Sequence, residues 1–511
     1  MSRRIGLVAL GPLLGLVVSV VAFGRAHGAI AAQGQPVIAG QARTGDVGVK
    51  GIERFAPEAL GGTLFFSAAR PSFGRELWKT NGTSAGTVLV KDIDPTASSS
   101  PKELTGAAGM LFFVADDGIR GEELWKSNGT RAGTVIVKDI APGGGSGPRE
   151  LTTVRRTVFF PAGGARGREL WKSDGTRAGT GRVKDINPTG HSSPTELTNV
   201  GGTLFFSADD GLHGKELWKS NGTGTGTVQV KDINPTGDSF PGELTNVAGT
   251  LFFTADDPVH GAELWKSNGT PGGTVRVKDI NSTPGESSGP QELTNVAGTL
   301  FFHANDGVHG MELWKSNGTR AGTVLVKDIS PSGHSVPGEL TNVAGTLLFD
   351  ASDLVRGREL WRSNGTPGGT VRVKDINPAG SSSPGELTNV GGTLFFYADD
   401  GLLGQELWKS NGHRAGTVMV KDINPDGSSV PRELANVSGT LFFSAIDGLH
   451  GQELWKSNGT RAGTVLVKDI RPSGSSFPRE LTYVVGSAEG IELGPTLHHE
   501  WTPRASGFPH S

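Results

Sequence analysis

The sequence predicts an all-β protein, a single β-propeller of about nine four-stranded blades. The stretch Gly-Lys-Glu-Leu-Trp-Lys-Ser-Asn-Gly-Thr at 214–223 recurs along the chain, and its tryptophans are 47, 46, 47, 47, 49, 47, 47 and 47 residues apart. With 79 glycines and 29 prolines in 511 residues, the apolar runs are broken into short segments. Several short strands in a repeat of this length are typical of a propeller blade.

Four extended segments can be marked in the clearest repeat. They are strand A (196–200), strand B (203–208), strand C (216–219) and strand D (227–233). Gly-Gly separates A from B, and Ser-Asn-Gly-Thr begins the turn between C and D, where tight turns need positive φ. We expect antiparallel sheets with strand A innermost and strand D outermost.

Strands B and D differ in their apolar pattern. Strand B is apolar on consecutive residues, as in Leu204-Phe205-Phe206, so both of its faces must be covered, which a neighbouring blade on each side would do. The central position of strand D accepts Gln229 and Arg276, which predicts that this position lies near solvent.

The repeat count and the chain ends predict the domain organisation. Copies of strand B begin at Thr63, Met110, Thr157, Thr203, Thr250, Thr299, Thr346, Thr393 and Thr440. Strand A occurs ten times if the degenerate copy at 57–60 is counted with the one at 480–482, so either terminus could supply the closing strand. We predict a signal peptide at 1–31, a linker at 32–54, the repeat array at 55–485, and a degenerate, flexible tail at 486–511.

The leader predicts export. Arg3 and Arg4 precede an apolar run from Ile5 to Phe23, followed by small residues that fit a cleavage site. An uncleaved membrane anchor is the alternative, because the run is long for a signal peptide. The chain has no cysteine, which excludes disulfides and thiolate metal ligands, and its net charge of −3 argues against nucleic acid as a partner.

The repeat resembles a known family. Glu-Leu-Trp-Lys-Ser-Asp-Gly-Thr at 169–176, followed by Gly179-Thr180, is similar to the ELWxxDGT repeat of exported bacterial proteins. The resemblance covers about 60–483, although eight copies carry Asn in place of the signature Asp. It implies an exported, propeller-like protein and no defined activity.

Candidate ligand residues gather on the loops that join B to C. In a propeller these loops share one face with the D to A loops, and we call it the loop face. The candidates are Asp116, Asp117, Asp209, Asp210, His213, Asp256, Asp257, His260, Asp306, His309, Asp399, Asp400, Asp447 and His450. Oxygen ligands suit Ca²⁺, so calcium at Asp209 and Asp210 is one hypothesis, and an Asx turn that ends strand B is the preferred one. No other cofactor is expected.

Other repeated residues are interpreted as structural. A catalytic site is normally one asymmetric group of residues, whereas the Glu of Glu-Leu-Trp and the Lys-Asp of Val-Lys-Asp-Ile recur in nearly every copy. We therefore predict no catalytic residue, Glu to Lys and Asp to Lys pairing, and tryptophans in an inter-blade core rather than on a sugar-binding platform. Asn-Gly-Thr matches a glycosylation acceptor pattern, but a role in the turn is sufficient.

The sequence as a whole favours an exported, non-enzymatic propeller that acts as a binding or structural module outside the cell or at its surface. We expect a monomer that binds a protein or glycan ligand on the loop face, with a membrane contact only through an uncleaved leader. Two alternatives remain. One is a carbohydrate-active lyase or hydrolase with its site at the propeller channel, and the other is a matrix protein without a ligand.

Overall fold

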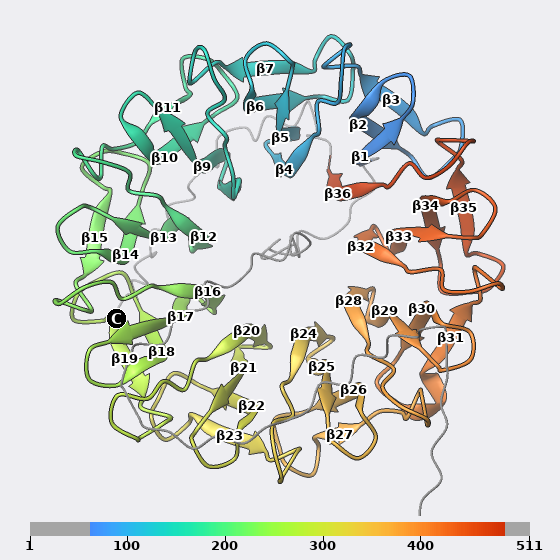
Figure 1. Cartoon of the computed structure of the whole chain (residues 1–511). Coiled ribbons are helices and arrows are strands. Elements are labelled where there is room, and N and C mark those ends of the chain that lie inside the picture. Colours follow the sequence, from blue (N-terminus) through green and yellow to red (C-terminus); the bar gives the residue numbers. More distant parts are fainter. Residues whose placement is uncertain (1–61, 486–511) are drawn as a thin grey trace, which may run out of the picture. The chain divides into compact units, whose positions relative to one another are not determined.

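The computed structural model of this chain describes residues 62–485, and these form nine four-stranded antiparallel sheets arranged in a ring (Figure 1). Each sheet corresponds to one repeat, so the prediction of an all-β propeller with nine blades is confirmed. The leader, the linker, the degenerate strand at 57–60 and the tail at 486–511 lie outside the described residues.

Two of the four strands of each blade lie toward the ring centre, in agreement with the expected order (Figure 1). The innermost strands, A, are β36 (Arg479–Val484), β4 (Lys102–Ala107), β8 (Thr152–Val154), β12 (Thr195–Val200), β16 (Gly242–Val247), β20 (Gln291–Val296), β24 (Gly338–Val343), β28 (Gly385–Val390) and β32 (Arg432–Val437). The next strands, B, are β1 (Thr63–Arg70), β5 (Met110–Asp116), β9 (Thr157–Gly164), β13 (Thr203–Asp209), β17 (Thr250–Asp257), β21 (Thr299–Asn305), β25 (Thr346–Ser352), β29 (Thr393–Asp399) and β33 (Thr440–Ile446).

The other two strands complete each blade on its outer side. Strands C are β2 (Gly74–Thr80), β6 (Glu122–Ser127), β10 (Gly167–Ser173), β14 (Lys215–Ser220), β18 (Gly261–Ser267), β22 (Met311–Ser316), β26 (Arg358–Ser363), β30 (Gln405–Ser410) and β34 (Gln452–Ser457). Strands D are β3 (Val88–Lys91), β7 (Val135–Lys138), β11 (Gly181–Arg182), β15 (Val228–Lys231), β19 (Val275–Lys278), β23 (Val324–Lys327), β27 (Val371–Arg372), β31 (Val418–Lys421) and β35 (Val465–Lys468). A short 3₁₀ turn, η1 (Arg414–Gly416), lies between β30 and β31.

The C-terminal copy of strand A closes the ring. The order of the first blade is β3-β2-β1-β36, and Thr63 pairs with Val484. We number this sheet blade 1 and continue in chain order to blade 9, which contains β32 to β35. Lys468 of blade 9 donates a hydrogen bond to the Thr87 carbonyl of blade 1 at 2.8 Å. The question of which terminus supplies the closing strand is thereby answered.

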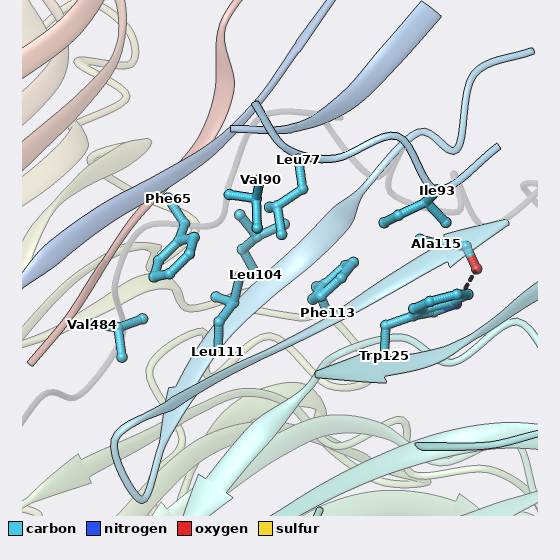
Figure 2. Close-up of a cluster of buried hydrophobic side chains, with 10 residues drawn as sticks. All are labelled: Phe65, Leu77, Val90, Ile93, Leu104, Leu111, Phe113, Ala115, Trp125 and Val484. Carbon is cyan, nitrogen blue, oxygen red and sulfur yellow. Dashed lines mark hydrogen bonds between the residues drawn. The ribbon is translucent and has the colours of Figure 1, made fainter. Parts of the chain in front are cut away.

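The core lies between blades, as strand B predicts. One cluster joins Phe65, Leu77 and Val90 of blade 1 to Phe113 and Trp125 of blade 2 (Figure 2). The neighbouring residue Phe66 points the other way, into the cluster shared with blade 9. Successive side chains of a strand face opposite sides, so each Phe-Phe pair joins a blade to both neighbours. The inter-blade position of the tryptophans is also confirmed.

Strand D differs in one detail from the expectation. Its first residue, such as Val88 or Val228, is about 37% exposed, whereas the central residue is half-buried. The central Leu89 lies directly opposite Trp78 of strand C, and this cross-strand neighbour shields it. The central position, predicted to lie near solvent, is thus only partly exposed, and the first residue of the strand is the more exposed one.

Candidate functional site on the loop face

The B to C and D to A loops lie together, which confirms the loop face. Asp116 at the end of β5 donates its backbone N–H to the Ser99 carbonyl of the preceding D to A loop at 3.0 Å. Arg75 at the start of strand C donates its backbone N–H to the Ser98 hydroxyl at 2.9 Å. The two sets of loops therefore form one continuous surface.

In seven blades an aspartate of the B to C loop holds a turn. Asp210 Oδ1 accepts the backbone N–H groups of Leu212 and His213, both at 2.9 Å, and Asp210 Oδ2 lies 2.8 Å from His213 Nδ1. The same arrangement recurs with Asp257 and His260, with Asp306 and His309, and with Asp447 and His450. The Asx-turn interpretation is confirmed by these hydrogen bonds.

In three pairs, those of Asp210, Asp306 and Asp447, the pKa of both partners is shifted. The hydrogen bond to Asp210 raises the pKa of His213, and His309 and His450 are raised in the same way by their own aspartates. Burial alone would raise the pKa of Asp210, but hydrogen bonds from His213 and the loop N–H groups outweigh it, and the pKa is lowered. Each pair is thus a charge-compensated unit within one loop.

The remaining candidates also serve their own loops. Asp209 Oδ1 accepts the Gly211 N–H at 2.6 Å, and Asp116 and Asp399 do the same for Gly118 and Gly401. Asp117 pairs with Arg120, and Asp400 accepts the N–H groups of Leu402 and Leu403. Asp256 lies at the end of β17 beside Asp257, where burial raises its pKa.

The loops do not converge on a metal. Among residues 62–485, no group of three or more histidine, aspartate or glutamate side chains could hold a metal ion. The oxygens of Asp209 and Asp210 named in the calcium hypothesis accept hydrogen bonds from their own loop. We do not carry the calcium hypothesis further.

The glutamate of Glu-Leu-Trp does not pair with lysine, which corrects the sequence prediction. Glu216 is fully buried and accepts hydrogen bonds from Ile233 N–H at 2.8 Å and from the Ser239 hydroxyl at 2.8 Å. It therefore fixes the D to A loop of its own blade to strand C. Burial raises its pKa to about 7. The error arose because the Ser of the D to A loop carries no charge and so suggests no partner for an acid.

The lysine of Val-Lys-Asp-Ile binds the next blade through a carbonyl. Lys231 donates to the Thr274 carbonyl at 2.9 Å, and its ammonium lies 5.7 Å from the centre of the Trp265 ring. The equivalent carbonyl bond occurs at all nine blade junctions, from Lys91 to Lys468. The expected Asp to Lys pairing is therefore wrong as well, and the contact is a cation–π and carbonyl contact.

A second glutamate, the one that precedes Leu-Thr at the beginning of strand A, has a function that the sequence did not reveal. Glu150 has φ of 49°, and its Oε2 accepts the Leu197 N–H of the next blade at 3.3 Å. Burial, with the charges of Glu196 and Glu103, raises its pKa to about 7. All nine copies of this residue have φ between 49° and 61°. Glutamate has no preference for this conformation, so only its recurrence before Leu-Thr could have pointed to it.

The opposite face carries the A to B and C to D turns, and we call it the turn face. Asn81 Oδ1 accepts the Thr83 N–H at 3.1 Å and its hydroxyl at 2.7 Å, so the predicted turn role of Asn-Gly-Thr is confirmed. Gly86 is required there because a Cβ would lie 1.9 Å from Asn81 Oδ1. A shallow cavity of about 190 Å³ lies on this face between blades 6 and 7, lined in part by Phe301 and Lys315.

Three positions at the inner part of the loop face differ from blade to blade, and we call them the variable belt. They are the residue before Glu in strand A, the fifth residue of strand B and the residue before Glu in strand C. In blades 6 to 9 they are Gln291, His303 and Met311, then Gly338, Asp350 and Arg358, then Gly385, Tyr397 and Gln405, then Arg432, Ser444 and Gln452. Nothing in the repeat pattern marks them except that they vary.

Side chains of the variable belt contact one another. His303 is buried, with Nδ1 2.6 Å from the Pro337 carbonyl of blade 7, and burial lowers its pKa. Asp350 pairs with Arg358, which also donates to the Val336 carbonyl at 2.7 Å. The Arg432 guanidinium of blade 9 lies 4.1 Å from the centre of the Tyr397 ring of blade 8. Blades 6 to 9 therefore differ in chemistry from one another at these positions.

The part of the chain that the structure describes contains no helix long and apolar enough to cross a membrane.

Comparisons with known proteins assign the chain to no family. No protein-family model and no curated protein sequence matches the chain. A structure from an analysis of two prolyl endopeptidases is 12% identical, covers 68% of this chain and 54% of its own, and gives a TM-score of 0.39. A puromycin hydrolase is 12% identical over 68% of this chain and 58% of its own, at a TM-score of 0.31. Prolyl oligopeptidase B from Galerina marginata is 10% identical, covers 75% of this chain and 51% of its own, and gives a TM-score of 0.41. The chain spans little more than half the length of these structures.

Proposed function

We propose that this chain is an exported, non-enzymatic binding module of the ELWxxDGT-repeat type, and that its loop face is the binding surface. The observation that carries the proposal is the variable belt. Ser67, Val114, Pro161, Ser207, Thr254, His303, Asp350, Tyr397 and Ser444 occupy one position in nine copies of an otherwise uniform repeat.

The constant residues support this assignment by contrast. The glutamates, lysines and tryptophans that recur in every blade are engaged in contacts that join strands and blades, as Glu216, Lys231 and Trp265 illustrate. Side chains of the variable belt differ in charge and size instead, and those that are partly exposed, such as Tyr397 and Arg432, are available to a ligand on the loop face. Rigid strands hold these side chains, which lowers the entropic cost of binding.

The ring form favours a partner that presents the same group many times. Loops from nine blades on one face can each make a weak contact, and linked weak contacts give a high overall affinity. A polymeric glycan, a protein array and a membrane are surfaces of this kind. Export is supported by the charged and apolar leader pattern of the sequence.

The test exchanges residues between blades. Tyr397→Ser with Arg432→Gly installs residues that Ser207 and Gly242 already provide at the same positions, so the fold should be kept. The matched control is His413→Thr on the turn face, which restores the residue of the other copies. Binding of the chain to arrays of glycans and surface proteins is then measured as a function of concentration.

We expect the variable-belt variant to lose at least tenfold in affinity for the ligand that the natural chain retains, at an unchanged thermal midpoint. The His413→Thr control should bind as the natural chain does. Equal binding by both variants would contradict the assignment of the loop face. Cleavage of a bound polysaccharide would contradict the non-enzymatic part of the proposal.

A further inference from the structure

In seven of the nine blades, the tip of the B to C loop carries an exposed aliphatic side chain. These residues, which we call the aliphatic crown, are between 61% and 88% exposed. They are Ile119, Leu212, Val259, Val308, Val355, Leu402 and Leu449. In blade 1 the position is Ser72, and in blade 3 the loop is shortened to the hairpin tip Ala165-Arg166.

The crown is held in place by seven aspartates, and the sequence marked all of them except Asp353 as candidate ligands. The backbone N–H of every crown residue donates to Oδ1 of the aspartate two positions earlier, at 2.9 to 3.1 Å. Because the blades are equivalent, the fixed turns place the seven tips at one level around the ring. The Asx turns therefore present apolar side chains rather than oxygen ligands.

Exposed apolar side chains are distributed unequally between the two faces. Among residues 62–485, the large apolar side chains that are more than 40% exposed lie in B to C and D to A loops, apart from Val485 at the end of the described residues. They include Phe240, Val336 and Phe477 of the D to A loops. The turn face has polar Asn-Gly-Thr turns instead. Isolated exposed apolar residues are ordinary, but a one-sided ring of them indicates a contact surface.

The chemistry of the crown favours a fluid apolar partner. Its residues vary among Ile, Leu and Val, so the aliphatic character is kept while the shape is not. A protein pocket would select one shape at each tip, and it would have to match seven separate points around a ring. A lipid bilayer accepts any aliphatic shape at any spacing and needs only that the tips reach one plane.

The charges beside the crown are compensated locally. His213, His309 and His450 follow their crown residues and pair with Asp210, Asp306 and Asp447 at 2.7 to 2.8 Å. Arg356, which follows Val355, pairs with Asp375 at 2.7 Å. The loops therefore offer no excess of positive charge to anionic headgroups, and a neutral, zwitterionic surface fits them best.

We infer that the aliphatic crown inserts into the interface of a lipid surface with zwitterionic headgroups, so that the ring lies with its loop face against the membrane. This inference rests on the proposed function in taking the loop face as the contact face, and it names the partner surface. Burial of the seven aliphatic side chains in the bilayer drives this binding. The affinity is therefore insensitive to ionic strength.

The test measures partition of the chain 32–511 onto phosphatidylcholine vesicles by co-sedimentation. This chain lacks the apolar N-terminal run but keeps every strand and the closing contacts between blades 1 and 9, all of which lie within 62–485. The loss variant is Leu212→Ser, Val308→Ser, Leu402→Ser and Leu449→Ser. Its matched control changes four partly exposed valines of the outermost strands, Val135→Ser, Val228→Ser, Val324→Ser and Val418→Ser. The gain variant is Ser72→Leu with Ala165→Leu.

We expect the loss variant to lower the partition coefficient at least tenfold, the valine control to leave it unchanged, and the gain variant to raise it severalfold. These ratios should be the same at low and high salt. Absence of vesicle binding by the natural chain, or equal binding by the loss and gain variants, would overturn the inference. So would face-to-face pairing of rings in sedimentation velocity without vesicle binding. Array binding that depends on Tyr397 and Arg432 would then still support the proposed function, whereas its loss as well would remove both.

Discussion

At the residue scale, two glutamates of each repeat with similar surroundings have different partners. Glu216 of strand C accepts donors from its own blade, whereas Glu150, just before β8, accepts the Leu197 N–H of the next blade. Both are carboxylates that satisfy backbone N–H groups, and burial raises the pKa of each to about 7. A buried donor left without an acceptor is costly, so these acids stabilise the segments whose N–H groups they accept.

We expect Glu216→Ala to lower the free energy of unfolding by about 3 kcal/mol, because two buried donors, Ile233 N–H and the Ser239 hydroxyl, lose their acceptor. Urea unfolding followed by tryptophan fluorescence measures the change. The control is the exposed Glu286→Ala, for which we expect a change within about 0.5 kcal/mol. Similar losses for both variants would contradict the role of Glu216.

At the element scale, strand B joins neighbouring blades because its consecutive aromatic residues face opposite sides. Phe205 belongs to the cluster shared with blade 5, and Phe206 to the cluster shared with blade 3. The position of Phe205 is occupied by Leu348 in blade 7, which is also buried there. One copy thus shows that a smaller apolar side chain is compatible with the junction.

We expect Phe205→Leu to cost about 1 kcal/mol and Phe205→Ala about 3 to 5 kcal/mol, since only the second leaves a large cavity. Thermal unfolding of the two variants under the same conditions gives the comparison. The reverse change, Leu348→Phe, tests whether blade 7 has adapted to the smaller residue. A cost for Phe205→Leu equal to that of Phe205→Ala would show that leucine cannot fill this junction.

At the scale of the whole molecule, the ring is closed by a strand from the far end of the sequence. Strand β36 pairs with β1, and Thr482 donates to the Leu104 carbonyl of blade 2 at 3.1 Å. Without β36, blade 1 would have three strands and an unpaired inner edge, which is a site for association with other chains.

A chain that ends at residue 478 should therefore unfold at a lower temperature and associate, whereas a chain that ends at 485 should behave as the full chain does. Thermal unfolding and sedimentation velocity on both truncations measure the two effects. Equal midpoints and a monomeric 1–478 chain would show that the ring does not need β36 for closure.

The pH dependence of stability is also a property of the whole molecule. Burial raises the pKa to about 7 in seven glutamates, namely Glu76, Glu150, Glu216, Glu339, Glu406, Glu433 and Glu453. Their ordinary pKa in the unfolded chain is 4.5, so between these values the folded state binds more protons than the unfolded state. The stability they contribute is full below pH 4.5 and is lost as the pH rises through 7. The raised pKa of His213 also makes the folded state less stable as the pH rises. The lowered pKa of the buried His303 has the opposite effect on stability.

We expect the thermal midpoint to rise by several degrees as the pH falls from 8 to 5 at constant ionic strength. Glu216→Gln with Glu406→Gln removes two of the titrating groups and should flatten this dependence. A midpoint that is constant or that falls between pH 8 and pH 5 would contradict the prediction.

The sequence by itself determined the class of fold, the nine blades and the two-sided burial of strand B. These follow from local pattern and period, as the spacing of Trp218 and Trp265 shows, because each blade repeats one local design. Only the tertiary structure decided which terminus closes the ring, that Glu216 binds a loop rather than a lysine, and that Asp210 fixes the turn that exposes Leu212. Each of these depends on partners brought together from other loops or blades, or on a turn geometry that places a side chain in solvent. Periodicity reports which residues recur, but the contacts between segments decide what each of them does.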